Sequence, residues 1–530
     1  MTYTTSTARA AWAATGTAAL LALGGCAEPA RFTVAEGSGN NPALPTPSRA
    51  LIPTVNIAPA RGWPDGAMPT PAPGLQVQAF ARDLDHPRWL LVLPNGDVLV
   101  AETNAPPKAE APKGITAWIK GKVMGLVMKR AGAAVPSANR ITLLRDTDGD
   151  GVADVRSVLL DGLYSPFGMA LVGERLFVAN ADAVLAFPYR RGDTTISAAG
   201  IQLVALPGGP INHHWTKSLI ASPDGQRLYV GVGSNSNIGE NGMAAEEGRA
   251  AVWEVDARTG AHRVFASGLR NPVGLAWDAS GRTLWAVVNE RDELGSDLVP
   301  DYLTSVRDGA FYGWPYSYYG QRVDTRVKPP APDQVAKAVV PDFALGAHVA
   351  PLGLASAAGS RLPAPFANGM FIGQHGSWNR KPKAGYDVVF VRFDANGNPQ
   401  GLPVPVLPTA VDSGGDDPRS SFPYARPGWT GSARDALAHV QRYFAGPLPR
   451  QYKATRNGLS GTDFSTKFSP WLATGALSPR QIHAELLAHE AREGASDGSR
   501  WIVFELLWRE HFRLLHYRFG RKLYRGRGLT

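Results

Sequence analysis

The chain has 530 residues, a net charge of +9, 44% hydrophobic and 19% charged residues. This balance is typical of a folded globular protein, excludes wholesale disorder, and leaves room for two to four domains. The chain contains a single cysteine, so an intrachain disulfide is excluded.

The first 26 residues predict an export signal. Arg9 precedes an apolar run over residues 10–23, which ends in L-A-L-G-G-C at Cys26. The run is too short to span a bilayer. L-G-G-C resembles the lipobox of bacterial lipoproteins, which implies cleavage before Cys26, lipidation of its thiol, and an exported chain anchored to a bacterial membrane. The alternative is a chance cysteine after an ordinary signal peptide.

Residues 27–74 are rich in Pro, Ala, Gly and Ser, which predicts a flexible tether. From 75 to 407 the chain alternates short apolar runs with glycine turns, and one unit recurs. An apolar run, a turn such as P-D-G and a second apolar run form a hairpin signature. Five copies lie at His86–Glu102, Ser165–Asn180, His213–Val232, Asn271–Glu290 and Ala350–Trp378. Repeats of this kind predict a β-propeller, with the polar residues at the start of each unit converging on the central axis.

Two features interrupt the repeats. Residues 105–137 carry several lysines among Pro, Gly and Ala, which predicts a long loop or a short helix. The run D-T-D-G-D-G follows, with Asp146, Asp148 and Asp150 at alternate positions. This spacing suits calcium, but the acid that closes an EF-hand loop is missing. A plain surface turn is the alternative.

The polar cluster of the repeat region comprises His213 and His214, Arg270 and Asn271, the run Asn289–Glu293, His348, and Q-H-G-S-W-N-R from Gln374 to Arg380. A histidine near neutral pH can accept a hydroxyl proton, and arginines bind carboxylates bidentately. Each residue alone could equally be structural. Their recurrence at matching places in the units favours one shared site.

Four runs of this region are distinctive: NHHWTKSLIASPDGQRLYVGVGSNSN, GLRNPVGLAW, VVNERDELGSDLVPDYLTSVRDGAFYGWPYSYYG and GQHGSWNR. They resemble the sorbosone dehydrogenase family, whose members are relatives of the soluble quinoprotein glucose dehydrogenases. The resemblance covers about residues 75–407. It implies a six-bladed propeller that binds pyrroloquinoline quinone (PQQ) and calcium. It also implies oxidation of a sugar or aldehyde by hydride transfer to the quinone, with electrons passing to a respiratory-chain or quinone acceptor.

The same resemblance implies roles for individual residues. His214 corresponds to the general base, and Arg270 with Asn271 to the pair that reaches cofactor and substrate. His348 stands where the family contacts the quinone, with His375 or Arg380 as a looser cofactor contact. Asp292 and Glu293, in the loop from Arg291, are expected near calcium. The family's last blade is missing after residues 401–403, so we expect a propeller that lacks most of its sixth blade.

Residues 408–431 predict a linker, and the composition then changes. Residues 416–530 carry 18 Lys and Arg against 10 Asp and Glu. This excess indicates either a solvated helical face or a polyanion-binding surface. Amphipathic helices are expected over 432–445, 479–492 and 498–519, with Ser478 as an N-cap and Pro479 at the first helical position.

Two motifs follow: YKATRNGLSGTDFSTKFSPWLATGALSPRQI, from Tyr452, and WIVFELLWREHFR, from Trp501. They resemble the photolyase and cryptochrome family, and the preceding segment DPRSSFP indicates the DASH branch. The resemblance implies a small all-α fragment of an FAD-binding domain. By motif, its phosphate and ribityl contacts are Tyr452, Ser465, Thr466, Lys467, Phe468 and Ser469. The adenine, lesion and flavin edge corresponds to Glu505, Trp508 and Arg509. The resemblance covers only part of the flavin pocket, so weak FAD binding is expected.

These patterns give three hypotheses of function. The first is a lipid-anchored PQQ-dependent sugar or aldehyde dehydrogenase. The second is a light-dependent flavoprotein acting on DNA, which an exported location disfavours because nucleic acid is not met there. The third is a propeller that binds sugars without chemistry. The two parts are expected to behave as separate units.

Overall fold

The computed structural model describes residues 29–33, 35–48, 54–60, 62–63, 66–107, 131–133, 135–407, 429, 431–458 and 462–520. The chain divides into two compact units, Met1–Val411 and Asp412–Thr530. The proposed signal with Cys26, most of the basic insertion and most of the 408–431 linker lie outside the described residues.

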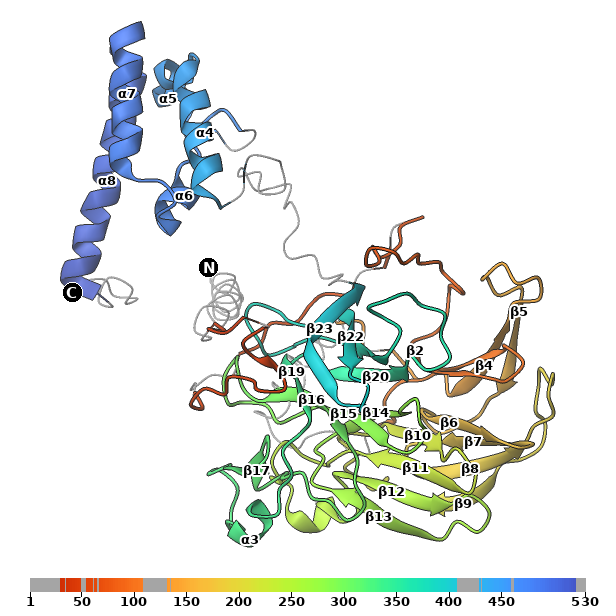
Figure 1. Ribbon diagram of the computed structural model, residues 1–530. Coiled ribbons are helices and arrows are strands. Elements are labelled where there is room, and N and C mark those ends of the chain that lie inside the picture. Colours follow the sequence, from red (N-terminus) through yellow and green to blue (C-terminus); the bar gives the residue numbers. More distant parts are fainter. Residues whose placement is uncertain are drawn as a thin grey trace, which may run out of the picture. The chain divides into compact units, whose positions relative to one another are not determined.

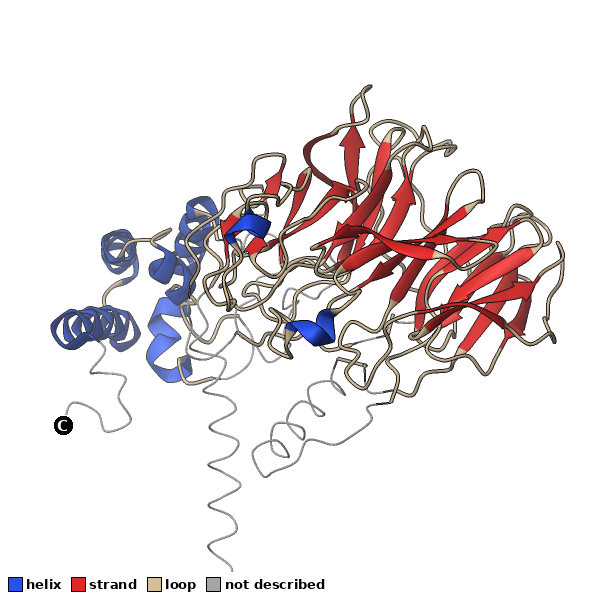
Figure 2. Ribbon diagram, turned by 90° about the horizontal axis from the view of Figure 1, so that it is seen from below, coloured by secondary structure: helices blue, strands red, loops and turns tan. Residues whose placement is uncertain are grey.

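The first unit is mainly β and forms a β-propeller, as expected (Figures 1 and 2). Its described part contains five antiparallel sheets with four core strands each, consecutive in sequence except in the fourth sheet. The first sheet contains β2 (Pro87–Val92), β3 (Val98–Glu102), β4 (Arg140–Arg145) and β5 (Val155–Leu160). The second contains β6 (Met169–Val172), β7 (Arg175–Ala179), β8 (Ala183–Pro188) and β9 (Ile201–Ala205). The third contains β10 (Lys217–Ala221), β11 (Arg227–Val232), β12 (Ala251–Asp256) and β13 (His262–Ser267).

The fourth sheet contains β14 (Pro272–Trp277), β15 (Leu284–Val288), β16 (Pro300–Ser305) and β19 (Phe343–Ala347). The fifth contains β20 (Pro351–Ser356), β21 (Gly369–Gln374), β22 (Asp387–Phe393) and β23 (Pro399–Leu407). Short elements outside these sheets are η1 (Met243–Glu246), β17 (Ser317–Tyr318), β18 (Arg322–Val323) and α3 (Pro332–Val335). Each predicted repeat supplies the first two strands of one sheet.

The repeated turn explains the hairpins. Gly225, in the P-D-G turn between β10 and β11, has φ of +71°. A glycine adopts this conformation without steric cost, and the turn fixes the register in which Ala221 pairs with Leu228. Apolar residues of adjacent sheets then pack face to face, as Leu219 of β10 does in a cluster with Ala170 of β6.

The inner strands converge on an apolar cluster. Each inner strand brings one large or branched apolar residue to it, at the third place of the recurring triplets P-R-W, S-P-F, H-H-W, N-P-V and A-P-L. These residues are Trp89, Phe167, Trp215, Val273 and Leu352. The Trp89 and Phe167 ring centroids are 5.0 Å apart, and the Phe167 and Trp215 centroids are 6.1 Å apart. The cluster therefore fixes the residues just before it at one end of the axis.

The N-terminal segment departs from the tether expectation. Within it, β1 (Ser38–Gly39) pairs antiparallel with β19 and becomes a fifth strand of the fourth sheet. The Ala72 amide donates to the Val406 carbonyl at 2.8 Å, beside the last strand of the fifth sheet. Open strand edges carry unpaired backbone groups, and this segment satisfies some of them. Composition alone misses this, because backbone pairing needs no apolar side chains.

The described residues of the second unit form five helices, α4 (Ala433–Ala445), α5 (Leu448–Thr455), α6 (Ser469–Thr474), α7 (Pro479–Glu493) and α8 (Asp497–Phe519). Ser478 caps α7 in a capping box with Gln481, as its position before Pro479 predicts. The helices share a core that includes Tyr443, Phe444 and Trp471. None of the described helices is long and apolar enough to cross a bilayer.

We predict that Gly274→Ala destabilises the propeller. A Cβ at this position would lie 2.7 Å from the Leu354 Cβ and 2.7 Å from the Val287 Cγ2. The inner strands β14 and β20 must then separate, at a cost of about 1–3 kcal/mol. Chemical denaturation measures this loss. Gly209→Ala is the matched control, because a Cβ there meets nothing within 4 Å. Equal stabilities of both variants would contradict this account of inner-strand packing.

Candidate functional site

Arg270 and Asp292 form the centre of a polar network at the axial end of the sheets. Arg270 lies directly before β14, and its Nη2 is 3.3 Å from the Asp292 Oδ2. Its Nη1 donates to the Glu290 carbonyl at 2.6 Å, and its Nη2 donates to the Asn237 Oδ1 at 3.0 Å. Asp292 also accepts from the Asn379 Nδ2 at 2.8 Å. The third, fourth and fifth sheets are thereby joined through one buried arginine.

His348 completes this network. It has φ of +63° just before β20, and its Nδ1 lies 3.7 Å from the Asp292 Oδ1. Its Nε2 donates to the Gly295 carbonyl at 2.9 Å. Burial would lower the pKa of His348, but the hydrogen bond and charge of Asp292 raise it above its ordinary value. Burial would raise the pKa of Asp292, yet His348 and Arg270 hold this pKa below the ordinary range. The two shifts favour the charged forms of His348 and Asp292.

His214 lies before β10 in a different electrostatic setting. Its Nδ1 donates to the Ser234 carbonyl at 2.7 Å, which leaves Nε2 as the acceptor nitrogen of the neutral ring. Burial, followed by the charge of Arg270, lowers the pKa of His214 well below its ordinary value. The ring is therefore neutral at pH 7. A neutral imidazole with its acceptor nitrogen fixed is suited to take a proton.

Asn271 lies against the same histidine. A Cβ on Gly233 would collide with the Asn271 side chain and with the His214 Cβ, so only glycine allows this approach. The Asn271 Oδ1 is buried and has no hydrogen-bond partner among the described residues. The same holds for the Oδ1 atoms of Asn180 and Asn379. Buried amide oxygens of this kind normally find a donor, so these three atoms are unsatisfied hydrogen-bond acceptors.

A pair of buried carboxyl groups lies beneath this network. The Asp301 Oδ1 accepts from the Glu290 amide at 2.7 Å, and its Oδ2 accepts from the Ala350 amide at 2.7 Å. Burial raises the pKa of Glu290 to about 7 and that of Asp301 to about 6. Asp301 was not predicted as a site residue, although a carboxylate within the buried strand β16 indicates a polar role.

Two residues expected to contact the cofactor differ in their exposure to solvent. Arg380 is 6% exposed, and its guanidinium donates to the carbonyls of Ser296 and Pro382, both at 3.0 Å. It therefore serves to join chain segments rather than to face the axis. His375 follows β21, is exposed, and lies within electrostatic reach of Arg88.

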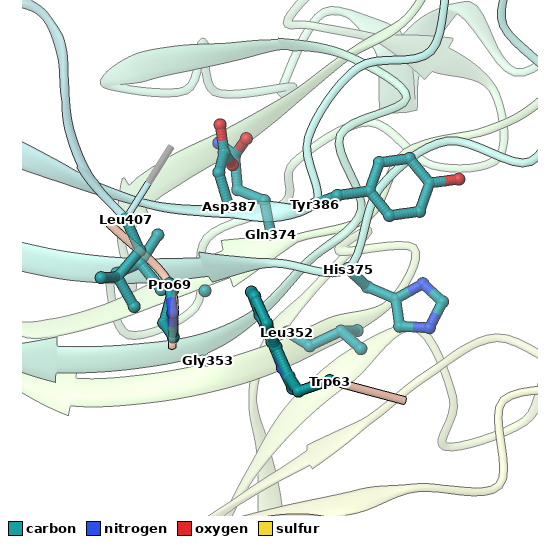
Figure 3. A pocket seen from close by; sticks show the side chains of 11 residues that line it. Trp63, Pro69, Leu352, Gly353, Gln374, His375, Tyr386, Asp387 and Leu407 are labelled. Carbon is teal, nitrogen blue, oxygen red and sulfur yellow. The ribbon is translucent and has the colours of Figure 1, made fainter. Parts of the chain in front are cut away.

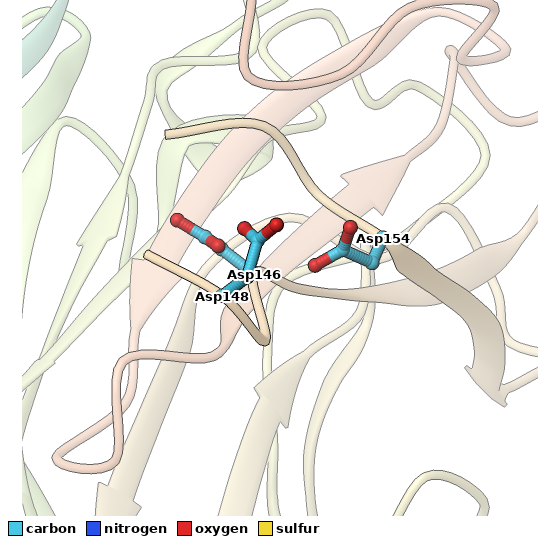
Figure 4. Close-up of side chains that lie close together, drawn as sticks. All are labelled: Asp146, Asp148 and Asp154. Carbon is cyan, nitrogen blue, oxygen red and sulfur yellow. The ribbon is translucent and has the colours of Figure 1, made fainter. Parts of the chain in front are cut away.

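The acidic loop after β4 gathers three carboxylates, from Asp146, Asp148 and Asp154 (Figure 4). One ligand oxygen from each lies within 4.8 Å of the others. Asp150, which the spacing placed in this group, instead accepts from the Val152 amide at 2.8 Å. The loop turns back toward β5 at this point, so Asp154 takes the third position. Asp292 and Glu293 join no such group among the described residues.

A cleft of about 380 Å³ borders the fifth sheet (Figure 3). Its walls include Trp63 from the N-terminal segment, Leu352 at the axis, and His375 and Tyr386 at one side. Asp387 also lines the cleft, and burial raises the pKa of its carboxyl to about 6. No pattern in the sequence indicates this cleft, because the fifth sheet and a segment expected to be a tether build it together.

In the helical unit, the proposed flavin motif lies on the loop before α6. Lys467 is 6% exposed with φ of +56°, and its Nζ has no hydrogen-bond partner among the described residues. The Thr466 carbonyl accepts from the His439 Nε2 at 2.9 Å. Phe468 and Tyr452 are buried in the core, so they support the loop from within. Ser469 begins α6, and Ser465 is half-buried.

The other three predicted flavin residues lie on α8. Glu505 accepts from the Arg456 Nη1 at 2.6 Å and from the Trp501 Nε1 at 3.0 Å. Arg509 donates to the Leu472 carbonyl at 3.1 Å. Trp508 is 43% exposed. These residues share one helix, but Glu505 is already engaged within the unit.

We predict that Glu290→Gln removes a pH-dependent loss of stability. A raised acid pKa means that the folded state holds its proton more tightly than the unfolded state, so stability falls as pH rises from about 4.5 to about 7. The shift corresponds to a loss on the order of 3 kcal/mol. Denaturation from pH 4.5 to 8 should therefore show the variant gaining stability relative to the parent as pH rises. Glu293→Gln, at an exposed neighbour, is the control. A constant difference across this range would contradict the assignment.

Residues 136–301 and 330–406 match the TrAA12-like family. The iodide structure of the Trichoderma reesei Carbohydrate-Active Enzymes Family AA12 protein is 19% identical to the chain, with a TM-score of 0.50 over 65% of this chain and 86% of that one. The calcium structure of the same protein gives 19% identity and a TM-score of 0.50, over 68% of this chain and 87% of that one. This likeness establishes the fold.

The C-terminal part matches a different group. Cryptochrome DASH of Vibrio parahaemolyticus is 50% identical over 101 residues, which cover 19% of this chain and 23% of the relative. Cryptochrome DASH of Xenopus laevis is 43% identical over 114 residues, covering 21% of each chain. The chain thus spans less than a quarter of these relatives. Both expected resemblances are confirmed: the propeller is similar to the PQQ-dependent dehydrogenases of the TrAA12-like family, and the helical unit to part of a DASH cryptochrome.

Proposed function

We propose that the propeller is a quinoprotein oxidoreductase that oxidises a sugar or an aldehyde with PQQ. The observation that carries this proposal is the pairing of a neutral His214, with its acceptor Nε2 fixed, and the buried Arg270 beside it. A base and a cation together are what removal of a hydroxyl proton requires. The similarity to PQQ-dependent dehydrogenases supports the choice of cofactor.

The residues at the axis fit PQQ. The buried Oδ1 atoms of Asn271 and Asn379 lack partners among the described residues, and Asp292 raises the pKa of His348. In this proposal Asn271, Arg270 and His348 hold the cofactor. When bound, PQQ supplies a quinone that accepts hydride from a carbon atom.

The chain's own residues then perform the proton chemistry. His214 accepts the proton of a sugar hydroxyl, or of a hydrated aldehyde, at Nε2. Asp292 holds Arg270 in place and balances its charge. The apolar cluster around Phe167 and Trp215 closes the axis below the site and excludes water from that side. The specific substrate class, sorbosone or aldose, follows from the sequence resemblance.

Calcium fits one of the two predicted places. The Asp292 carboxylate faces Arg270, His348 and Asn379, so it offers no free oxygen pair for a metal ion. The carboxylates of Asp146, Asp148 and Asp154 converge and are the oxygen ligands that calcium prefers. We assign any calcium site to this loop. Export and lipidation at Cys26, with transfer of electrons to a membrane-bound quinone or respiratory acceptor, complete the proposal.

The expected result is PQQ-dependent dye reduction by the purified full chain with aldoses or sorbosone. His214→Ala should lower kcat by about 10²–10⁴-fold, the usual contribution of a general base. The exposed His262, changed to Ala, is the matched control. Unchanged turnover in the His214 variant would remove that residue from the mechanism. Sugar binding without turnover in the parent would favour a non-catalytic propeller.

A second candidate function belongs to the helical unit, and Lys467 favours it. The Lys467 ammonium is buried, lies 3.4 Å from the centroid of the Phe464 ring and has no hydrogen-bond partner among the described residues, so a phosphate would satisfy it. We propose that this loop is a remnant phosphate contact for FAD, as the similarity to DASH cryptochromes suggests. A light-dependent activity on DNA would require this contact.

Purified chain titrated with FAD should therefore show weak, saturable quenching of flavin fluorescence. Lys467→Met should weaken binding about tenfold, because it removes the only cation aimed at the phosphate in this proposal. Lys453→Met, at an exposed helical position, is the control. Equal FAD affinities of both variants would exclude Lys467 as the contact.

A further inference from the structure

We propose that Arg88, with His86 and His375, forms a binding site for the carboxylate group of a small organic acid, at the axial seam between the first and fifth sheets. This site goes beyond the proposed oxidation chemistry. It needs neither His214 nor turnover.

Arg88 occupies the middle place of the first P-R-W triplet, at the start of β2. Its guanidinium carbon lies 5.6 Å from the centroid of the Trp215 ring. Its Nη1 lies 3.3 Å from the His86 Nε2. The ring face and the imidazole hold the guanidinium toward the axis, because a cation over an aromatic face is attracted to it.

No carboxylate among the described residues pairs with Arg88. Two other arginines near the axis do have an acid: Arg270 faces Asp292, and Arg291 forms a buried ion pair with Asp324. Burial lowers the pKa of Arg88, and no neighbouring acid opposes it. Arg88 is half-buried and its charge is not balanced by an acid among the described residues, so an anion that supplies the missing charge would be bound favourably.

The two histidines add donors around the same point. Burial and the charge of Arg88 lower the pKa values of both His86 and His375. His375 also lowers the pKa of His86, although the two residues belong to the fifth and the first sheet. The first and last sheets therefore present three nitrogen-bearing side chains to one another across the seam.

The ligand class follows from the guanidinium and the neighbouring cleft. A planar guanidinium matches the two oxygens of a carboxylate bidentately. His375 also lines the cleft of about 380 Å³, whose walls at Trp63, Leu352 and Leu407 suit a carbon skeleton (Figure 3). The one carboxylate lining that cleft, Asp387, points away from the His375 ring in this view. An organic acid with an apolar body thus fits better than a bare inorganic anion.

Such a carboxylate has two possible sources, which share this chemistry. It can belong to PQQ, which carries carboxylates, or to a separate organic acid. Arg88 lies over the ring of Trp215, the residue that follows His214 in the chain. The experiment therefore titrates both kinds of probe.

The purified full chain is titrated by calorimetry at low salt with benzoate, with its neutral isostere benzamide, and with PQQ. We expect benzoate to bind at least tenfold more tightly than benzamide, and Arg88→Gln to weaken benzoate binding at least tenfold. Arg191→Gln, at an exposed position, is the matched control. His375→Gln, which should weaken binding more mildly, provides a second variant if Arg88→Gln is unstable by thermal denaturation.

Each outcome decides the proposal. Benzoate that binds to the parent and is lost in Arg88→Gln supports a site for organic acids. Tenfold weaker PQQ binding in that variant, with no benzoate binding to the parent, assigns the site to the cofactor's carboxylate. Affinities for benzoate and PQQ that are unchanged in both variants would overturn the proposal. If the chain binds benzoate or PQQ through Arg88 but shows no turnover, only the proposed oxidation is contradicted.

Discussion

The packing of the inner strands around one axis is the constraint on which the rest of the propeller depends. Trp89, Phe167, Trp215, Val273 and Leu352 come from five repeats and meet in one apolar cluster. Because each is the third residue of its triplet, the residues before them are forced to the same end of the axis. Polar groups that are hundreds of residues apart in sequence are thus brought within reach of each other.

This arrangement explains the contrast between the two axial histidines. Asp292 raises the pKa of His348, whereas burial, followed by the charge of Arg270, lowers the pKa of His214. The buried pair of Arg270 and Asp292 therefore acts in opposite directions on the two imidazoles. A site with one proton acceptor and one fixed cation follows from the electrostatics of Arg270 and Asp292, whichever ligand it receives.

Much of this was predictable from the sequence, but not all of it. The repeats predicted the hairpins and the axial position of His214, Arg270 and Asn271, since turn glycines and apolar runs are local signals. The partners of Asp292 were not predictable, because Asn237 and Asn379 approach it from other sheets. Pairing of β1 with β19 was missed for a related reason: backbone hydrogen bonds leave no mark in composition. The contacts of Arg380 with the Ser296 and Pro382 carbonyls were not predictable either, because they depend on how distant segments pack.

In the proposed function a cofactor binds at the axial end of the sheets, between His214, Arg270 and His348. Hydrogen exchange of the full chain, measured by mass spectrometry with and without PQQ, locates such a site. We expect slower exchange on PQQ addition in the segments that precede β10, β14 and β20, with the outer strands β5, β9 and β13 unchanged. Protection confined to other segments, or no change at saturating PQQ, would contradict it.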